Sequence, residues 1–143
     1  MLKLAYCGDD CNLCPRYIAT KSGNEEELKK IAVLWQTVGW RETVLPPEEM
    51  VCHGCTSVKL ELCKYDIIRE CAQGRDLEHC GKCKDYPCSE LEKVFDQTKI
   101  YAENLKKNCP KDVYERFEEA FFLKKQKLDN AHIEYLSSQK RAK

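Results

Sequence analysis

The spacing of apolar residues predicts helices along most of the chain. Between Glu25 and Val38, apolar side chains recur every three or four positions, which is the period of an amphipathic helix. Asn24 precedes this run as an N-cap candidate, acidic residues fill the first turn, and Gly39 ends it. A shorter helix is predicted over Asp66 to Gln73, ending at Gly74.

The last third of the chain carries the same periodicity in three further segments. Ser89-Glu90-Leu91-Glu92 has the form of a capping box, so we expect a helix that begins directly after Cys88. A second capping box, Asp112-Val113-Tyr114-Glu115, predicts a helix that runs to about Leu128, and Ala131 to Gln139 predicts a last one. The side chains expected to face the core are Leu91, Val94, Phe95, Thr98, and Tyr101 or Ala102, followed by Val113, Phe117, Ala120 and Phe121.

Strand patterns are short by comparison. No alternating run longer than four residues predicts a strand, and Leu45-Pro46-Pro47 predicts a turn rather than a helix. The predicted fold class is therefore mostly α, a small helical domain with irregular cysteine loops organised by metal and at most short hairpins. We expect a single domain over residues 1–143, with a cysteine-rich metal-binding part (1–88) and a helical part (89–143).

Charge and the amino-terminal sequence narrow the class of protein. The chain has 24 acidic and 24 basic residues, a balance that argues against binding nucleic acid through bulk charge. Met1 to Tyr6 is too short for the apolar region of a signal peptide, and no run approaches the length of a membrane span. We therefore expect a cytoplasmic protein without membrane contact, whose thiols stay reduced and serve metal or redox chemistry rather than disulfides.

Cysteine is the residue that carries the chemistry. Eleven of the 143 residues are cysteines, and ten of them precede residue 89 in three groups. Gaps of two to four residues let one turn of the chain point its thiolates at one metal ion, at a Zn–S distance of about 2.3 Å. The candidate metal ligands are Cys7, Cys11, Cys14, Cys52, Cys55, Cys71, Cys80, Cys83 and Cys88.

Two of the groups contain a Cys-x2-Cys pair with a glycine beside a thiol, a form typical of zinc knuckles. They are Cys52-His53-Gly54-Cys55 and Cys80-Gly81-Lys82-Cys83. A first assignment joins these four cysteines at one zinc ion and joins Cys7, Cys11, Cys14 and Cys88 at a second. Cys71 is then a spare ligand or an exchange partner.

Other assignments stay open. The Cys7-x3-Cys11-x2-Cys14 spacing also holds the iron–sulfur cluster of radical enzymes that use S-adenosylmethionine, but this chain is too short for their barrel. Cys109 is predicted to be a free or buried thiol, and the role of Cys63 is open. His53 and His79 adjoin the knuckles as exposed neighbours or as substitute ligands, whereas His132 is predicted to lie on a helix surface.

No catalytic motif accompanies the cysteines. The sequence has no Ser-His-Asp pattern and no glycine-rich phosphate loop, so a binding role is favoured over an enzymatic one. We predict a structural-zinc module, with two zinc ions and a protein as its partner. The alternatives are an iron–sulfur electron-transfer or sensor protein, and a thiol-based enzyme or metal-handling protein.

Four motifs in order resemble a family of small cysteine-rich bacterial and archaeal proteins of unknown function. Tyr6 to Pro15 matches the opening Cys-Gly-x-x-Cys-x-x-Cys-Pro, and Cys52 to Cys55 matches Cys-x-Gly-Cys. Ile68 to Ala72 matches Ile-Arg-x-Cys-Ala, and Cys80 to Cys88 matches Cys-x-x-Cys-x-x-Tyr-Pro-Cys. The resemblance covers about residues 5–95. It implies metal binding, with zinc as the expected metal, and implies no known reaction.

Overall fold

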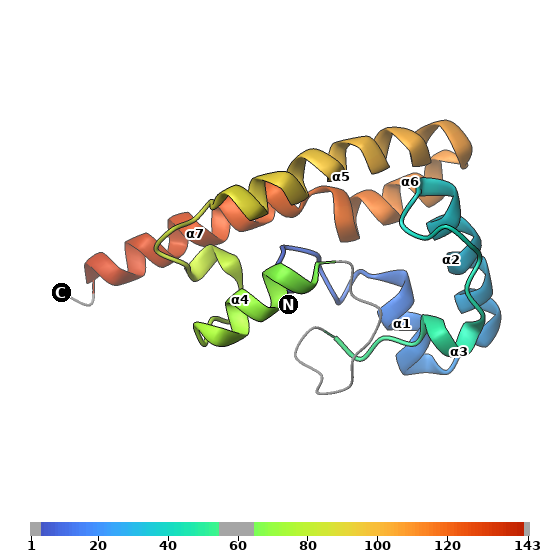
Figure 1. Cartoon of the computed structure of the whole chain (residues 1–143), viewed down its shortest axis with the longest axis horizontal. Helices are drawn as coiled ribbons and strands as arrows, with labels where there is room; N and C mark the ends of the chain where they lie inside the picture. The colour runs from blue at the N-terminus through green and yellow to red at the C-terminus, as the bar shows by residue number, and fades with distance from the viewer. Residues whose placement is uncertain (1–3, 55–64, 142–143) are drawn as a thin grey trace.

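The computed structural model describes residues 4–54 and 65–141, and these residues form a mostly helical protein (Figure 1). The helices are α1 (Pro15–Ser22), α2 (Glu25–Val38), α3 (Pro47–Met50), α4 (Asp66–Gly74), α5 (Ser89–Asn108), α6 (Lys111–Phe117) and α7 (Lys124–Arg141). A 3-10 turn, η1 (Cys80–Lys82), precedes α5, and a π-helical turn, η2 (Glu118–Phe122), joins α6 to α7. No strand occurs among the described residues, where an isolated antiparallel bridge joins Leu4 and Asp10. The predicted fold class is confirmed.

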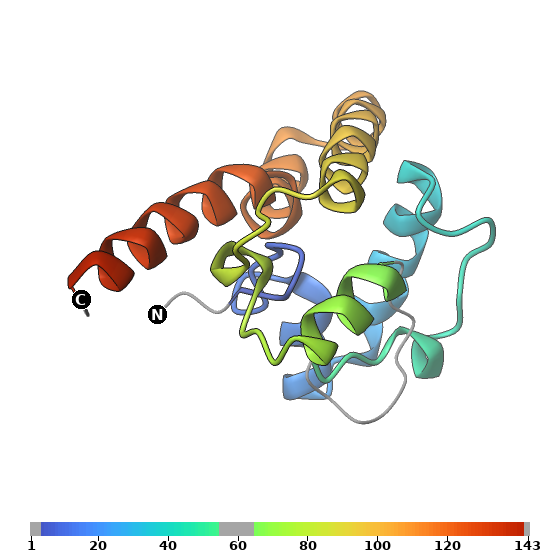
Figure 2. The same ribbon diagram turned by 60° about the vertical axis from the view of Figure 1, so that its left-hand side comes forward.

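Helix packing divides the molecule into two ends. At one end α2 packs against α1, α3 and α5, and α5 also packs against η2. At the other end α4 packs on α5, and α7 packs on η1 (Figure 1). The carboxy-terminal half of α7 extends past the other helices in both views (Figures 1 and 2). The cysteine loops lie between these two ends.

An aromatic cluster fills the core between α2, α5 and η2. The Trp40 ring meets Phe121 edge-on at 5.0 Å between centroids and Trp35 at 5.2 Å. Both tryptophans and Phe121 are buried. Edge-to-face pairs of this kind add about 0.5–1.5 kcal/mol each to the burial of the rings. This cluster belongs to the same hydrophobic core as the buried cysteines of the first loop, Cys7, Cys11 and Cys14.

Two helices form where the sequence predicts them. The helix predicted from Glu25 has the expected bounds, with Asn24 Oδ1 accepting from the N–H of Glu27 at 3.1 Å and Gly39 at a φ of 92°. The helix predicted from Asp66 is also present as α4. Local capping signals were sufficient for both helices.

The helix α5 begins directly after Cys88, as expected, but the N-caps that the two capping boxes predict are wrong, by one residue for α5 and by two for α6. Cys88, not Ser89, is the N-cap of α5, and its backbone is extended (φ −87°, ψ 167°). Likewise Pro110 caps α6, so Asp112 lies inside the first turn of that helix. Neither N-cap forms a side-chain capping bond. A preceding residue fixed in the extended conformation thus decides where each helix begins.

Three other predictions change in the structure. The break expected near Leu128 lies instead at the π-helical turn and Leu123, and α7 is continuous beyond it. Pro47 begins a one-turn helix instead of a plain turn, because proline is compatible with the first helical position. The helix α1 was not predicted, although Pro15 at its first turn and a left-handed Gly23 at its end are recognisable signals.

Candidate metal centre

The first cysteine loop is a tight turn packed under η2 and α7. The N–H of Ala5 donates to Asp9 O at 2.7 Å, and the N–H of Asp10 donates to Ala120 O at 2.9 Å. The π-helical geometry of η2 interrupts the regular helical bonding in which Ala120 would otherwise take part. The loop is therefore ordered against the helical body by backbone bonds, with Cys7, Cys11 and Cys14 buried.

Cys14 sits at the amino-terminal end of α1, where backbone N–H groups point at its sulfur. Burial raises the pKa of the Cys14 thiol to about 12, and the charges of Asp9 and Cys52 act in the same direction. The N–H groups of Tyr17 and Arg16 oppose this rise. Amide N–H groups that point at a sulfur stabilise its thiolate form, and a bound cation would stabilise that form further.

Cys52 reaches Cys14 because α1 holds the chain at the carboxy-terminal end of α3. The buried guanidinium of Arg16 donates from Nε to Met50 O and from Nη2 to Val51 O, the latter at 3.0 Å. Thr20 Oγ1 then accepts the N–H of Cys52 at 3.0 Å. Arg16 follows Cys14 in sequence by only two positions, so one short helix places both thiols. We call Cys7, Cys11, Cys14 and Cys52 the first thiol group.

A second thiol group surrounds a cavity of about 140 Å³. Cys71 comes from α4, Cys80 and Cys83 flank η1, and Cys88 caps α5. All four line the cavity, together with apolar side chains that include Ile68, Leu77 and Leu91. Three separate segments of the chain thus bring four thiols to one space.

Cys83 in this group receives two N–H donors. Arg75 Nη1 lies 3.2 Å from its sulfur, and the N–H of Asp85 lies 3.4 Å from it. Arg75 is itself oriented by Asp85, whose Oδ2 is 2.8 Å from Nη1. These donors stabilise negative charge on the sulfur, which is the form that binds metals.

Cys80 is the more enclosed member of the group. Burial raises the pKa of the Cys80 thiol to about 12, and negative charge at Cys88, Cys83 and Cys71 adds to the rise. Four thiolates without a cation would therefore repel one another here. A metal ion would remove that repulsion and so convert the group to thiolates.

A buried ion pair lies beside the first loop and was not predicted. Lys124 Nζ is 2.9 Å from Asp9 Oδ1, although the lysine side chain is only 1% exposed. Burial alone would lower the pKa of Lys124, but the carboxylate of Asp9, together with Cys7 and Tyr65, raises it above the usual value. The lysine therefore stays charged and places a cation near Cys7.

The structure distributes the predicted ligands differently from the first assignment. Cys88 lies with Cys80 and Cys83, not with the cysteines of the first loop, and Cys71 is a full member of that group. Cys52 lies near Cys14. Cys55 and Cys63 fall outside the described residues. The first assignment joined the two Cys-x2-Cys pairs at one ion. In the structure, the path of the chain through α1 and α4 decides which cysteines lie together.

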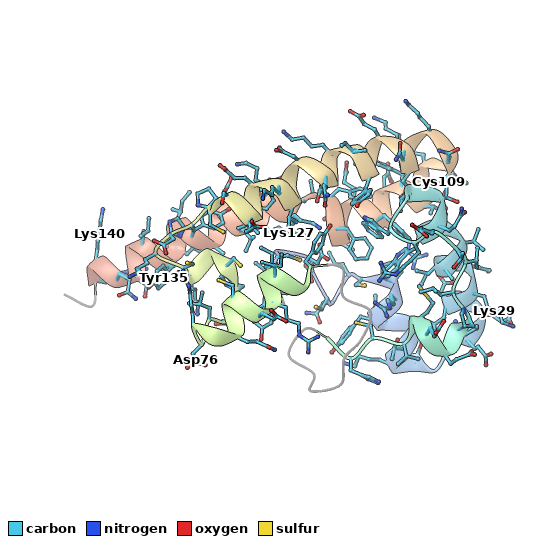
Figure 3. All side chains as sticks on the ribbon, in the orientation of Figure 1. Lys29, Asp76, Cys109, Lys127, Tyr135 and Lys140 are labelled. Atoms are coloured by element: carbon cyan, nitrogen blue, oxygen red, sulfur yellow. The ribbon has the colours of Figure 1, made fainter. Side chains whose placement is uncertain are left out.

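The remaining candidates have other surroundings. Cys109 lies at the turn between α5 and α6, away from the end of α4 marked by Asp76 (Figure 3). His53 is exposed, whereas His79 is buried and its Nδ1 accepts the N–H of Gly81 at 3.1 Å. Burial lowers the pKa of His79. His132, predicted to be a surface residue, is half-buried and contacts Gly81.

The donor chemistry of both groups fits a thiophilic metal. In the described residues, no three His, Cys, Asp or Glu side chains converge closely enough in this conformation to hold one ion. The nine described cysteines are nevertheless all free thiols, and several sulfurs face amide donors. Soft thiolates of this kind select zinc, copper(I) or iron–sulfur clusters. None of the described helices combines the length and the apolar character that a membrane span needs.

Comparisons with known proteins place the chain in a family without a known activity. No curated protein and no solved structure gives a significant match to it. One family profile matches residues 3–93, a region that contains both thiol groups and ends within α5. Because that match covers more than half of the chain, the protein belongs to the family DUF3795, described as proteins of unknown function.

Proposed function

We propose that this protein is a metal-thiolate module in which zinc ions bind the two thiol groups and stabilise the cysteine-rich part. The second group would use Cys71, Cys80, Cys83 and Cys88. The first would use Cys7, Cys11, Cys14 and Cys52, with Cys55 as a further candidate. Sites with four protein ligands leave no position open for substrate, so the role we propose is structural, in support of binding a protein partner in the cytoplasm.

The single observation that carries this proposal is the meeting of four thiols from three chain segments around one cavity. Free cysteines buried for packing alone have no reason to gather in fours. The two N–H groups that face Cys83 give that sulfur the surroundings of a metal-bound thiolate. Zinc binding would draw the thiols together, because the binding free energy of a structural zinc site is expressed as folding free energy.

A second candidate, an iron–sulfur protein, is favoured by the size of the cavity. Its 140 Å³ is about ten times the roughly 10–15 Å³ that one water molecule requires. A single zinc ion would occupy this space only after the four thiols had moved inward, whereas a cluster of several iron and sulfide ions needs such room. Four cysteine thiolates are also the usual ligands of such clusters.

Metal analysis of chain purified without oxygen tests both candidates. Cells would be supplied with zinc and iron, and zinc, iron and acid-labile sulfide would be counted per chain. We expect about two zinc ions per chain and a colourless protein. Iron with an equal amount of sulfide, and a brown chromophore that bleaches with dithionite, would refute the zinc proposal in favour of an iron–sulfur cluster.

Matched serine variants complete the test. Cys80→Ser should lower the metal content by about one ion per chain, because it removes one of four ligands. Cys109→Ser provides the control, since that cysteine lies at the α5–α6 turn (Figure 3). Reduced wild-type chain that carries no metal would refute the proposal.

A further inference from the structure

The carboxy-terminal helix α7 contacts the loop of the second thiol group at two points. His132 Nδ1 lies 2.7 Å from Gly81 O, and Tyr86 Oη lies 2.5 Å from Asp129 Oδ1. The Tyr86 and His132 rings also contact each other in a tilted arrangement, with 4.7 Å between their centroids and 38° between their planes. Asp129 and His132 are three positions apart, so one face of α7 makes both contacts.

One of the two contacts lies in each of the two intervals between the cysteines of the loop. Gly81 lies between Cys80 and Cys83, and Tyr86 lies between Cys83 and Cys88. Each interval between consecutive thiols is therefore fixed once to the same helix. Together with the contacts of Arg75 to Cys83 and Asp85, these bonds set the positions of the thiols.

The geometry at Gly81 is specific. A carbonyl oxygen only accepts hydrogen bonds, so His132 must carry its proton on Nδ1 and donate it to Gly81 O. On the other side of the turn, Gly81 donates its N–H to His79 Nδ1. A Cβ at residue 81 would lie 2.9 Å from the His79 ring and 3.3 Å from Ala131 Cβ. The knuckle glycine is thus held from both sides, and only glycine fits so close to α7.

Asp129 is itself fixed by a neighbour on its own helix. Lys125 Nζ lies 2.8 Å from Asp129 Oδ2, which leaves Oδ1 for the Tyr86 hydroxyl. This arrangement has the form of the outer hydrogen bonds that orient metal-binding loops. It is made by residues beyond the region 3–93 that matches the family profile.

We propose that Asp129 and His132 are positioning residues of the second thiol group, and that α7 is thereby part of its metal centre. The inference rests on the proposed function. Without these contacts, the Cys80–Cys88 loop would still carry its thiols, but the distances between their sulfurs would no longer be fixed. Loss of such outer partners typically lowers metal affinity by about 10–100-fold.

The test measures cobalt(II) affinity in full-length variants, with the thiolate-to-cobalt absorption as the signal. Asp129→Leu and His132→Leu should each weaken binding at the second group by about 10-fold or more. His132→Asn, whose amide can donate in place of Nδ1, should recover part of that loss. Glu134→Gln, an exposed residue of the same helix, provides the matched control and should bind as the wild type does.

Two further measurements separate positioning from general stability. The Cys80→Ser variant identifies which part of the titration belongs to the second group. Urea unfolding of the metal-free variants then shows whether the helical body is intact. Unchanged cobalt affinity in Asp129→Leu and His132→Leu would overturn this inference but not the proposed function. An equal loss at both thiol groups, in step with a loss of helical stability, would also overturn it. A wild-type chain that binds no cobalt would overturn the proposed function as well.

Discussion

The backbone N–H of Cys80 donates a 3.0 Å hydrogen bond to the carbonyl of Tyr6, the residue before Cys7. This bond joins the first residue of one thiol loop to the start of the other. The two groups are therefore not independent attachments on a helical body, because the backbone of each forms part of the support of the other. If one loop becomes less ordered, we expect the other loop to become less ordered as well.

Metal removal is the simplest test of this coupling. If a chelator strips metal from reduced protein, we expect faster hydrogen exchange in peptides from both loops, 4–14 and 79–90, over the same range of chelator concentration. The physical reason is that the Cys80 amide loses its protection when either loop loosens. A peptide from α2 provides the control and should keep its protection, since its core contacts are aromatic. Loss of protection in one loop at a time would contradict the coupling.

The grouping of thiols predicts how pairs of substitutions combine. Cys14→Ser and Cys52→Ser should remove the same metal ion, so that the double variant retains the ion of the second group. Cys14→Ser with Cys80→Ser should remove both ions, because each group loses one of four ligands. Metal counted per chain by mass spectrometry under native conditions distinguishes the two results. If the Cys52→Ser loss coincides with that of Cys80→Ser instead, the assignment first made from the sequence is right and the grouping in the structure is wrong.

Local sequence signals were sufficient for some elements of this fold and insufficient for others. The helix from Glu25 to Val38 has its cap, its dipole charges and its stop residue within a few positions, so its bounds follow from the sequence. The start of α5 depends on the backbone of Cys88, which the preceding loop fixes in an extended conformation. A capping motif alone carries no information about that loop, so the motif places the N-cap at Ser89, one residue too late.

The candidate site shows the same division between local and distant information. The thiol spacings are sufficient to predict metal-binding turns, because each turn needs only its own residues. Which turns meet depends on Arg16, whose guanidinium ties α1 to the carbonyls of Met50 and Val51. Nothing in the sequence near Cys52 indicates that contact. The buried ion pair of Lys124 also has no local signal in the sequence, since its partner Asp9 is more than a hundred positions away.

Gly8 provides a test of how closely the first loop must approach α7. It has a φ of 101°, and a Cβ there would lie 2.8 Å from both Lys124 O and Leu128 Cγ. Gly8→Ala should therefore lower the free energy of unfolding by about 2 kcal/mol or more, through strain and displacement of the loop. Gly74→Ala is the matched control, because no atom lies within 4 Å of its Cβ position. Urea unfolding of metal-free, reduced chains would measure both, and equal midpoints would rule out the close approach.

The Lys124–Asp9 pair should be the most costly single contact of the first loop to break. Lys124→Met leaves the Asp9 carboxylate without its cation, and we expect a loss of about 3 kcal/mol in the free energy of unfolding. The estimate is at the lower end of the range for buried pairs, because the Asp9 side chain keeps 22% of its exposure. Lys125→Met, the next residue on the same helix, breaks an exposed pair and should cost less than about 1 kcal/mol.

A double substitution separates the ion pair from the packing of the lysine stem. Asp9→Asn combined with Lys124→Met removes both charges and leaves no uncompensated ion, so it should be more stable than Lys124→Met alone. Urea midpoints of the three variants, measured in reduced chain without metal, give the comparison. If the double variant is no more stable than Lys124→Met, the charge interaction contributes little, and the packing of the lysine stem accounts for the loss.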